Sequence, residues 1–152
     1  MKQLLYVMAL VFASTSIYAQ DAPVQHLTFN HMALSVKDVN KSAAFYSEVL
    51  GLQEITNRTQ IQGIRWFSMG EGSELHLISI INEPVTINKA VHLALTSDNF
   101  DMILKQLEEH HITYSDWPGV EGKVNIRTDG IKQIFFQDPD GYWLEVNSVG
   151  QK

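Results

Sequence analysis

The chain contains two similar stretches, HMALS at residues 31–35 and HLALT at residues 92–96, which begin 61 residues apart. Each begins with a histidine and then alternates small or apolar side chains, the pattern of a strand with one buried face. A second pair of stretches follows in the same order, Leu75-His76-Leu77 in the first half and Leu144-Glu145-Val146 in the second. Matched segments in a fixed order indicate a duplicated module.

The residues around the first stretch predict one strand, a helix and three further strands. The first strand is expected over 26–36. The helix is expected over 38–50, where Asp38 or Asn40 can cap its start and Gly51 ends it. The remaining strands are expected over 52–59, 64–69 and 74–81, with turns between them.

The second half repeats this order. A strand over 90–96 precedes a helix over 99–110, which Ser97 or Asp98 can cap. The remaining strands are expected over 112–115, 124–127, 133–136 and 142–148. Apart from the additional short strand over 112–115, both halves therefore read βαβββ. The predicted fold class is α+β, with modules at 27–82 and 89–149 forming one domain over residues 27–149.

The N-terminal residues read as a targeting segment. Lys2 precedes an apolar run and small residues that end at Ala19, the order of a secretory signal peptide. A buried helix or an uncleaved anchor would be the alternatives. The sequence therefore predicts a signal peptide over 1–19, a flexible lead-in over 20–26, and an exported protein that is periplasmic or secreted.

Composition excludes several classes. Lys2 is the only charged residue of the signal, so the remainder carries 10 basic and 17 acidic residues. An acidic chain does not suit nucleic acid, whose phosphates demand clustered positive charge. No second apolar stretch is long enough to span a membrane. Cysteine is absent, so any metal must be held by histidine, carboxylate or backbone oxygen.

Four polar residues occupy equivalent places in the two modules: His31 and His92 on the first strands, His76 and Glu145 on the last. A charged glutamate on a core strand is costly unless it is paired or binds a metal. A histidine alone would more often be a hydrogen-bonded core residue, and Glu145 could pair with a lysine or arginine. Their matched positions favour one divalent metal site over four unrelated structural roles.

Other polar residues lack this support. His26 lies near the start of the domain, and His110 and His111 end a helix. Asp138 and Asp140 belong to DPDG, a turn sequence with no calcium-ligand spacing after it.

With these residues established, the chain resembles the vicinal oxygen chelate superfamily, which includes glyoxalase I, bleomycin-resistance proteins and extradiol dioxygenases. The resemblance covers residues 27–149. Its motifs are NHMALSVKDVNKSAAFYSEVLGL around His31, ELHLISI around His76, VHLALTSDN around His92 and FFQDPDGYWLEVN around Glu145.

The resemblance implies a cupped mixed sheet around one divalent ion, Zn, Ni, Co or Mn, with iron less expected. The metal would act as a Lewis acid on a small oxygenated substrate and stabilise an enolate or enediolate, as in a glyoxalase-like lyase or isomerase. Glu145 would leave the metal and carry the proton. Three positions depart from glyoxalase I. His76 replaces a carboxylate, Ser35 an arginine that holds glutathione, and Ile80 an asparagine.

Two other readings stay open. A non-haem Fe(II) dioxygenase would use His31, His92 and Glu145, although His76 would then occupy a position that oxygen or substrate needs. A non-catalytic small-molecule binder, similar to bleomycin-resistance proteins, would use the cup without a metal. Proteins of this family and size commonly form homodimers, with sites within one chain or shared between two. The loop over 115–125, which carries Trp117, is expected to act as a lid.

Overall fold

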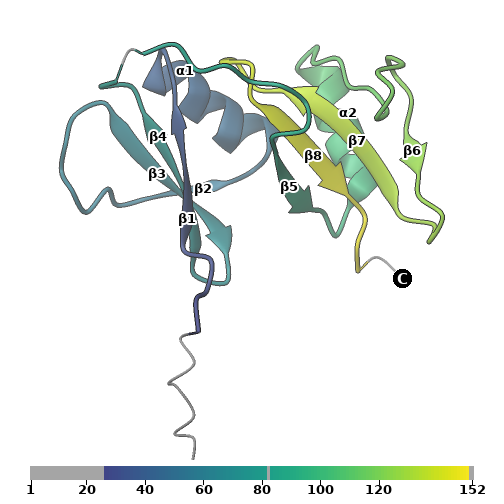
Figure 1. The fold of residues 1–152 in the computed structure, drawn as a ribbon, viewed down its shortest axis with the longest axis horizontal. Coiled ribbons are helices and arrows are strands. Elements are labelled where there is room, and N and C mark those ends of the chain that lie inside the picture. Colours follow the sequence, from purple (N-terminus) through teal and green to yellow (C-terminus); the bar gives the residue numbers. More distant parts are fainter. Residues whose placement is uncertain (1–25, 82, 151–152) are drawn as a thin grey trace, which may run out of the picture.

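The structure is a computed structural model that describes residues 26–81 and 83–150. It contains two four-stranded mixed sheets and two helices (Figure 1), which confirms the predicted α+β fold of two βαβββ modules. The proposed signal peptide lies outside the described residues, as does the lead-in up to residue 25. In the described part of the chain, no helix is both long and apolar enough to cross a membrane.

The first sheet has the strand order β1-β4-β3-β2, and the second has the order β5-β8-β7-β6. The strands of the first sheet are β1 (His31–Ser35), β2 (Gln53–Ile55), β3 (Ile64–Gly70) and β4 (Ser73–Ile78). Those of the second sheet are β5 (His92–Thr96), β6 (Asn125–Ile126), β7 (Lys132–Gln137) and β8 (Trp143–Asn147).

The register of the strands repeats between the modules. Strands β1 and β4 are parallel neighbours, with Ala33 opposite His76. Strands β5 and β8 are also parallel neighbours, with Ala94 opposite Glu145. The structural repeat therefore extends to individual residue pairs, so His76 and Glu145 hold equivalent positions in their sheets.

The first helix starts where the sequence predicts. Helix α1 (Val39–Ala44) is capped by Asp38, whose carboxylate accepts hydrogen bonds from the backbone N–H groups of Asn40 and Lys41. It continues into a π-helical turn, η1 (Phe45–Val49). Within this turn, the hydroxyl of Ser47 donates to the carbonyl of Ala43 at 2.7 Å. Such a back-bond competes with the regular ladder and is a local reason for the wider turn.

The second helix has a different cap from the predicted one. Helix α2 (Phe100–Glu109) is capped by Asn99, whose side-chain oxygen accepts from the backbone N–H of Met102. The prediction of Ser97 or Asp98 is therefore wrong. The Ser97 hydroxyl instead accepts from the backbone N–H of Asn99 and supports the capping residue from outside the helix.

The predicted strand over 112–115 is also wrong. Only Ser115 makes bridges, one to Phe135 and one to Glu121. Ile112 and Tyr114 pack against the hydrophobic core instead. A loop that turns back immediately after Ser115 leaves no length for a regular ladder, so the segment contributes side chains rather than strand hydrogen bonds.

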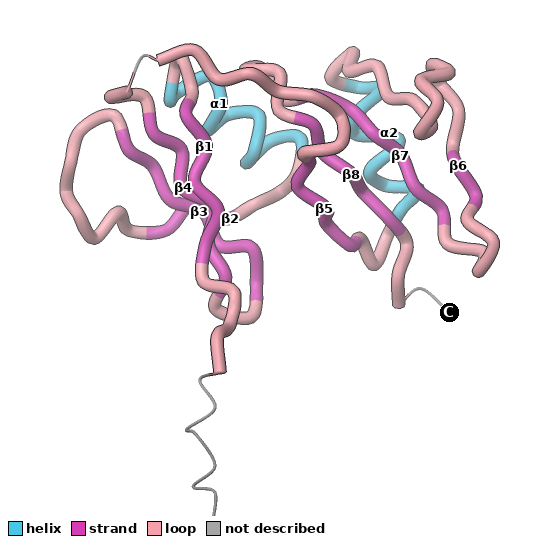
Figure 2. The backbone as a smooth tube through the Cα atoms, in the orientation of Figure 1, coloured by secondary structure: helices cyan, strands magenta, loops and turns pink. Residues whose placement is uncertain are grey.

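One hydrophobic core joins the two modules. Helix α1 lies between the two sheets, and α2 covers one face of the second sheet (Figures 1 and 2). The core collects alternate residues from the strands, including Leu34, Leu75 and Leu77 of the first sheet and Leu144 and Val146 of the second. Each sheet therefore has one face in the core and one face turned away from it, here called its open face.

The DPDG turn of the second module binds to the first module. Asp138 accepts from the backbone N–H groups of Asp140 and Tyr142, which makes the turn structural, as expected. The hydroxyl of the buried Tyr46 donates to Asp138. Burial raises the pKa values of both Asp138 and Tyr46. The polar contacts of this turn thus help to fix the two modules relative to each other.

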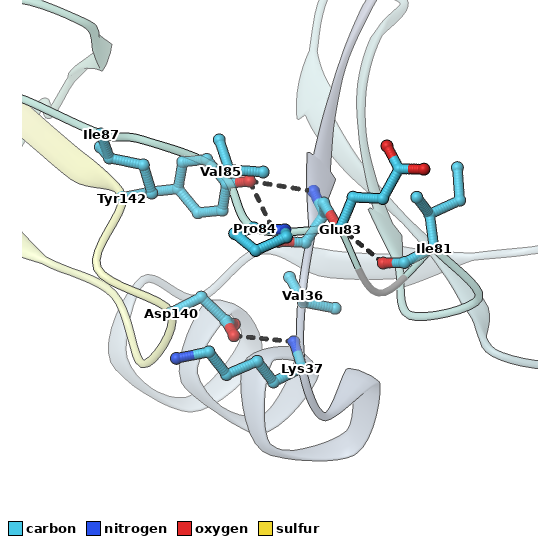
Figure 3. Close-up of a pocket in the computed structure, with 10 residues that line it drawn as sticks. Val36, Lys37, Ile81, Glu83, Pro84, Val85, Ile87, Asp140 and Tyr142 are labelled. Atoms are coloured by element: carbon cyan, nitrogen blue, oxygen red, sulfur yellow. Dashed lines mark hydrogen bonds between the residues drawn. The ribbon is translucent and has the colours of Figure 1, made fainter.

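A cavity of about 370 Å³ lies where this turn meets the segment that connects the modules (Figure 3). The hydroxyl of Tyr142 reaches across it, accepting from the backbone N–H of Ser35 at 3.2 Å and donating to the Ser35 carbonyl at 3.0 Å. Asp140 accepts from the backbone N–H of Lys37 and from the Ser42 hydroxyl. The end of β1 is therefore held by side chains of the second module.

Candidate metal centre

The first pair of predicted ligands, His31 and His76, lies together on the open face of the first sheet. Their rings stack with centroids 4.3 Å apart. Trp66 stacks on the other side of His76 at 4.0 Å, and the guanidinium of Arg58 lies 4.7 Å above the Trp66 ring. This column fixes the plane of the His76 imidazole, while His31, at its end, stays exposed.

The ring nitrogens of this pair already have polar partners. His31 Nδ1 is 2.7 Å from the side-chain oxygen of Asn30. His76 Nε2 is 2.8 Å from one carboxylate oxygen of Glu74, whose other oxygen accepts from Arg58 at 2.8 Å. The hydrogen bonds from His76 and Arg58 lower the pKa of Glu74. Before His76 could bind a metal through Nε2, Glu74 would have to release that nitrogen.

The second pair, His92 and Glu145, lies on the open face of the second sheet. His92 Nε2 is 3.4 Å from Glu145 Oε2. Glu145 Oε1 accepts from the side-chain amides of Gln133 at 2.8 Å and Asn147 at 2.9 Å. The carboxylate is thus anchored through one oxygen, and its other oxygen is turned towards the imidazole.

The other ring nitrogen of His92 contacts the segment before β5. His92 Nδ1 is 2.9 Å from the backbone carbonyl of Lys89. A carbonyl can only accept, so Nδ1 carries a hydrogen, and the neutral form of the ring has its lone pair on Nε2. That arrangement suits a metal ligand, because a histidine ligand is usually oriented by a hydrogen bond from its second nitrogen.

The Lys89 side chain lies among aromatic rings beside this pair. Its ammonium is 4.7 Å from the Phe135 ring centre, 4.9 Å from that of Trp143 and 5.7 Å from that of Trp117. Desolvation lowers the pKa of Lys89. Trp117 packs edge-to-face against both His92 and Phe135. The loop expected to act as a lid therefore touches a predicted ligand.

The structure brings the four predicted ligands together as two pairs, not as one group of four. Among residues 26–81 and 83–150, no three His, Asp or Glu side chains are close enough to hold one ion. The donor types nevertheless fit a borderline divalent metal, because three imidazoles and one carboxylate suit Zn, Ni, Co or Mn. Each open face offers only half of that set.

Several residues that contact these pairs were not predicted from the sequence, namely Asn30, Arg58, Glu74, Lys89 and Gln133. Glu74 could have been recognised, since strand alternation puts residues 74 and 76 on the same side. Lys89 could not, because its contacts depend on a loop some 26 residues later in the chain. Among the histidines left out, His26 is exposed and His110 forms the C-cap of α2.

The comparisons with known proteins agree with this fold. Residues 28–146 match the sequence model of the Glyoxalase/Bleomycin resistance protein/Dioxygenase superfamily. "Glyoxylase I 4" of Arabidopsis thaliana is 29% identical over 128 residues, which are 80% of this chain and 71% of that protein. The lactoylglutathione lyase of Pseudomonas aeruginosa is 27% identical over 150 residues, 83% of this chain and 85% of the lyase.

A solved structure, "Oxidase ChaP-H2", superposes with a TM-score of 0.69 at 25% identity and covers 84% of this chain and 97% of its own. The similar proteins thus include both a lyase and an oxidase. Their names describe those proteins, and they divide between two kinds of chemistry.

Proposed function

Because this chain belongs to the Glyoxalase/Bleomycin resistance protein/Dioxygenase superfamily, we propose that it is a metal-dependent, glyoxalase-like lyase or isomerase acting on a small oxygenated substrate. One observation carries the proposal. Two pairs of side chains of the types that bind metals stand at equivalent register positions on the open faces of two repeated sheets. Unrelated structural roles would not be expected to fall on matched positions.

We propose further that one metal centre is completed by two copies of the chain, with His31 and His76 from one copy and His92 and Glu145 from the other. Each open face supplies two donors, and a stable centre needs more. Apolar residues beside the ligands are exposed, among them Phe29 at 63% and Trp117 at 49%. A second copy seated on these faces would cover them and bring the two half-sets together.

The residues of this chain would hold the ion and move a proton. His31, His76, His92 and Glu145 would hold it, and a bound divalent ion supplies Lewis-acid polarisation of substrate oxygens. Glu145 is the candidate base, because Gln133 and Asn147 hold Oε1 while Oε2 stays available. A base held in this way can take a proton from the substrate and return it to a neighbouring atom.

A glutathione conjugate is not the proposed substrate. At Ser35, the position that matches the glutathione-holding arginine, the hydroxyl donates to the carbonyl of Ile81 at 3.1 Å. Its backbone N–H and carbonyl are engaged by Tyr142. This position therefore binds the connecting segment rather than presenting a positive charge, which favours a smaller substrate without the tripeptide.

The experiment is metal analysis combined with mixing of two double variants. One variant, His31→Ala with His76→Ala, lacks the donors of the first sheet, and the other, His92→Ala with Glu145→Ala, lacks those of the second. Each alone should lose the ion that the wild-type protein carries. Denatured together and refolded as a mixture, they should recover binding, because a mixed dimer contains one site with all four donors.

The outcomes separate the alternatives. Recovery of metal in the mixture supports a site shared between chains, whereas two variants that stay metal-free in the mixture would place the site elsewhere. Iron in the wild-type protein, together with oxygen uptake, would favour the dioxygenase reading, to which the similarity to an oxidase lends support. A wild-type protein that folds without binding any metal would leave a binding protein.

We also propose that residues 1–19 direct export and are removed. N-terminal sequencing of the protein recovered from the periplasm or medium should begin near residue 20. A protein that keeps Met1 or stays with the cytoplasm would contradict this proposal.

A further inference from the structure

The loop that carries Trp117 is attached to the rest of the molecule through Lys89. The Lys89 ammonium donates to the Ser115 hydroxyl at 3.2 Å, to the Asp116 carbonyl at 2.6 Å and to the Trp117 carbonyl at 3.0 Å. An ammonium has three donors, and all three are used on this loop. Lys89 is therefore not available to bind a substrate anion.

The same residue contacts the predicted ligand His92 through its backbone. The Lys89 carbonyl is 2.9 Å from His92 Nδ1, and this contact sets which nitrogen of the imidazole carries the lone pair. One residue thus holds the loop with its side chain and the ligand with its main chain. The ring of Trp117, packed against His92, closes this arrangement on the other side.

The remaining contacts of the loop lie at its base or within it. Ser115 pairs with Phe135 across a single bridge. Asp116 accepts from the backbone N–H groups of Gly119 and Val120, which shapes the tip. Lys123 forms an ion pair with Asp116 at 2.9 Å, from an exposed side chain. None of these contacts reaches His92, so Lys89 is the polar connection between the loop and the ligand within the described residues.

We propose that Lys89 is a positioning residue that couples the closed state of the Ser115–Glu121 loop to the orientation of His92. In the closed state, the loop anchors the Lys89 ammonium and thereby fixes the Lys89 main chain. The main chain in turn holds His92 with Nε2 facing Glu145. Opening the loop frees the ammonium and loosens the ligand. A substrate that contacts Trp117 would thereby change how firmly His92 is oriented in the proposed metal centre. This inference rests on the proposed metal site.

The test compares Lys89→Met, which keeps the apolar stem but removes the donors, with Lys89→Arg, which restores a cation with several donors. Lys123→Met is the matched control, because it removes the other lysine that contacts Asp116 without touching His92. Three quantities are measured: amide hydrogen exchange over residues 115–122, the His92 tautomer in the metal-free protein by long-range ¹H–¹⁵N NMR, and Co²⁺ affinity from visible absorption.

Lys89→Met should exchange faster over the loop, lose the single Nδ1–H tautomer of His92 and bind Co²⁺ about tenfold more weakly, the usual cost of removing support from a metal ligand. Lys89→Arg should return all three towards wild-type values. Lys123→Met should leave the tautomer and the Co²⁺ affinity unchanged. Should Lys89→Met fail to fold, Ser115→Ala removes one of the three acceptors and should produce smaller changes in the same directions.

A loosened loop with an unchanged His92 tautomer and unchanged Co²⁺ affinity would overturn the inference and leave a purely structural lysine. So would equal effects of the Lys89→Met and Lys123→Met changes. The tautomer is measured without metal. If the wild-type protein bound no Co²⁺, the proposed function would fail, while the tautomer and exchange results would still decide the role of Lys89.

Discussion

The two open faces carry equivalent pairs of predicted ligands, but the polar contacts of the two pairs differ. On the second sheet, His92 and Glu145 each have one polar atom anchored by a neighbour and a second atom turned towards the other residue. On the first sheet, His76 gives its Nε2 to Glu74, and Glu74 is held in place by Arg58. Identical register has therefore not produced identical chemistry.

This difference teaches that duplication fixes positions, whereas the neighbours of each position decide how it can act. In the proposed metal site, the second face would need no rearrangement to bind a cation, because its amide and carbonyl partners leave Nε2 of His92 and Oε2 of Glu145 available. On the first face, His76 would have to give up its contact with Glu74 before it could contact the proposed metal. The rings stacked around His76 hold its plane in either case, so only the Glu74 contact has to change.

The largest expected effect is on turnover. Glu145→Gln should lower kcat at least about 100-fold, because a positioned base contributes that much to proton transfer. Glu74→Gln, the matched change on the first face, should lower it less than about tenfold, because Glu74 is not expected to touch the reacting atoms. Steady-state rates with a substrate found by screening aldehydes and 2-oxo compounds give both numbers. Equal losses would erase the distinction between the faces.

The next effect concerns stability. Trp66, 8% exposed and stacked on His76, should cost about 3 to 5 kcal/mol when changed to alanine, because the change leaves a cavity. Trp117, 49% exposed, should cost under about 1 kcal/mol in the same substitution. Urea unfolding of the two variants measures the difference. A large loss in Trp117→Ala would show that its loop belongs to the core and cannot act as a lid.

The contribution of the DPDG turn, which joins the two modules, to the stability of the fold should depend on pH. Burial raises the pKa of Asp138 above its ordinary value of 3.8. A raised pKa favours the folded state while the group is protonated, so this contribution is complete below pH 3.8 and is lost as pH rises through the folded pKa. Asp138→Asn should therefore gain stability relative to wild type between pH 4 and pH 7, measured by denaturant unfolding at both values. The opposite trend would count against a buried, ionising Asp138.

The smallest effect is expected at Arg58. Its side chain is 66% exposed although it contacts Glu74 and Trp66, and exposed pairs of this kind contribute at most about 1 kcal/mol. Arg58→Met should thus change the unfolding midpoint only slightly, and less still at high salt. A loss above about 2 kcal/mol would mean that the guanidinium is essential to the stacked rings rather than an outer member of them.

Sequence patterns were sufficient for the order of elements and for the ligand positions on their strands. Strand alternation predicted that His76 lies on the other face of its strand from Leu75 and Leu77. The structure has the two leucines in the core. The predicted cap Asp38 is confirmed. These features depend on neighbours within a few residues, where side-chain period and capping chemistry dominate.

Features that depend on distant contacts could not be predicted. The π-helical turn after α1 needs a particular balance of hydrogen bonds. The strand predicted over 112–115 does not form because of the path of the loop that follows it. The sequence equally placed all four ligands in one cup, whereas the single chain separates them into pairs. Whether the two pairs meet within one chain or between two chains depends on long-range packing. The local sequence pattern is the same in both cases.

The hydroxyl of Tyr142 has one more consequence. Strand β1 lies at the end of its sheet, and a free strand edge invites pairing with other chains. By bonding to both the N–H and the carbonyl of Ser35, Tyr142 occupies the place that the backbone of an added strand would take. A foreign strand could then pair only with the part of β1 nearer His31, so this tyrosine from the opposite module blocks strand addition at the Ser35 end of the edge.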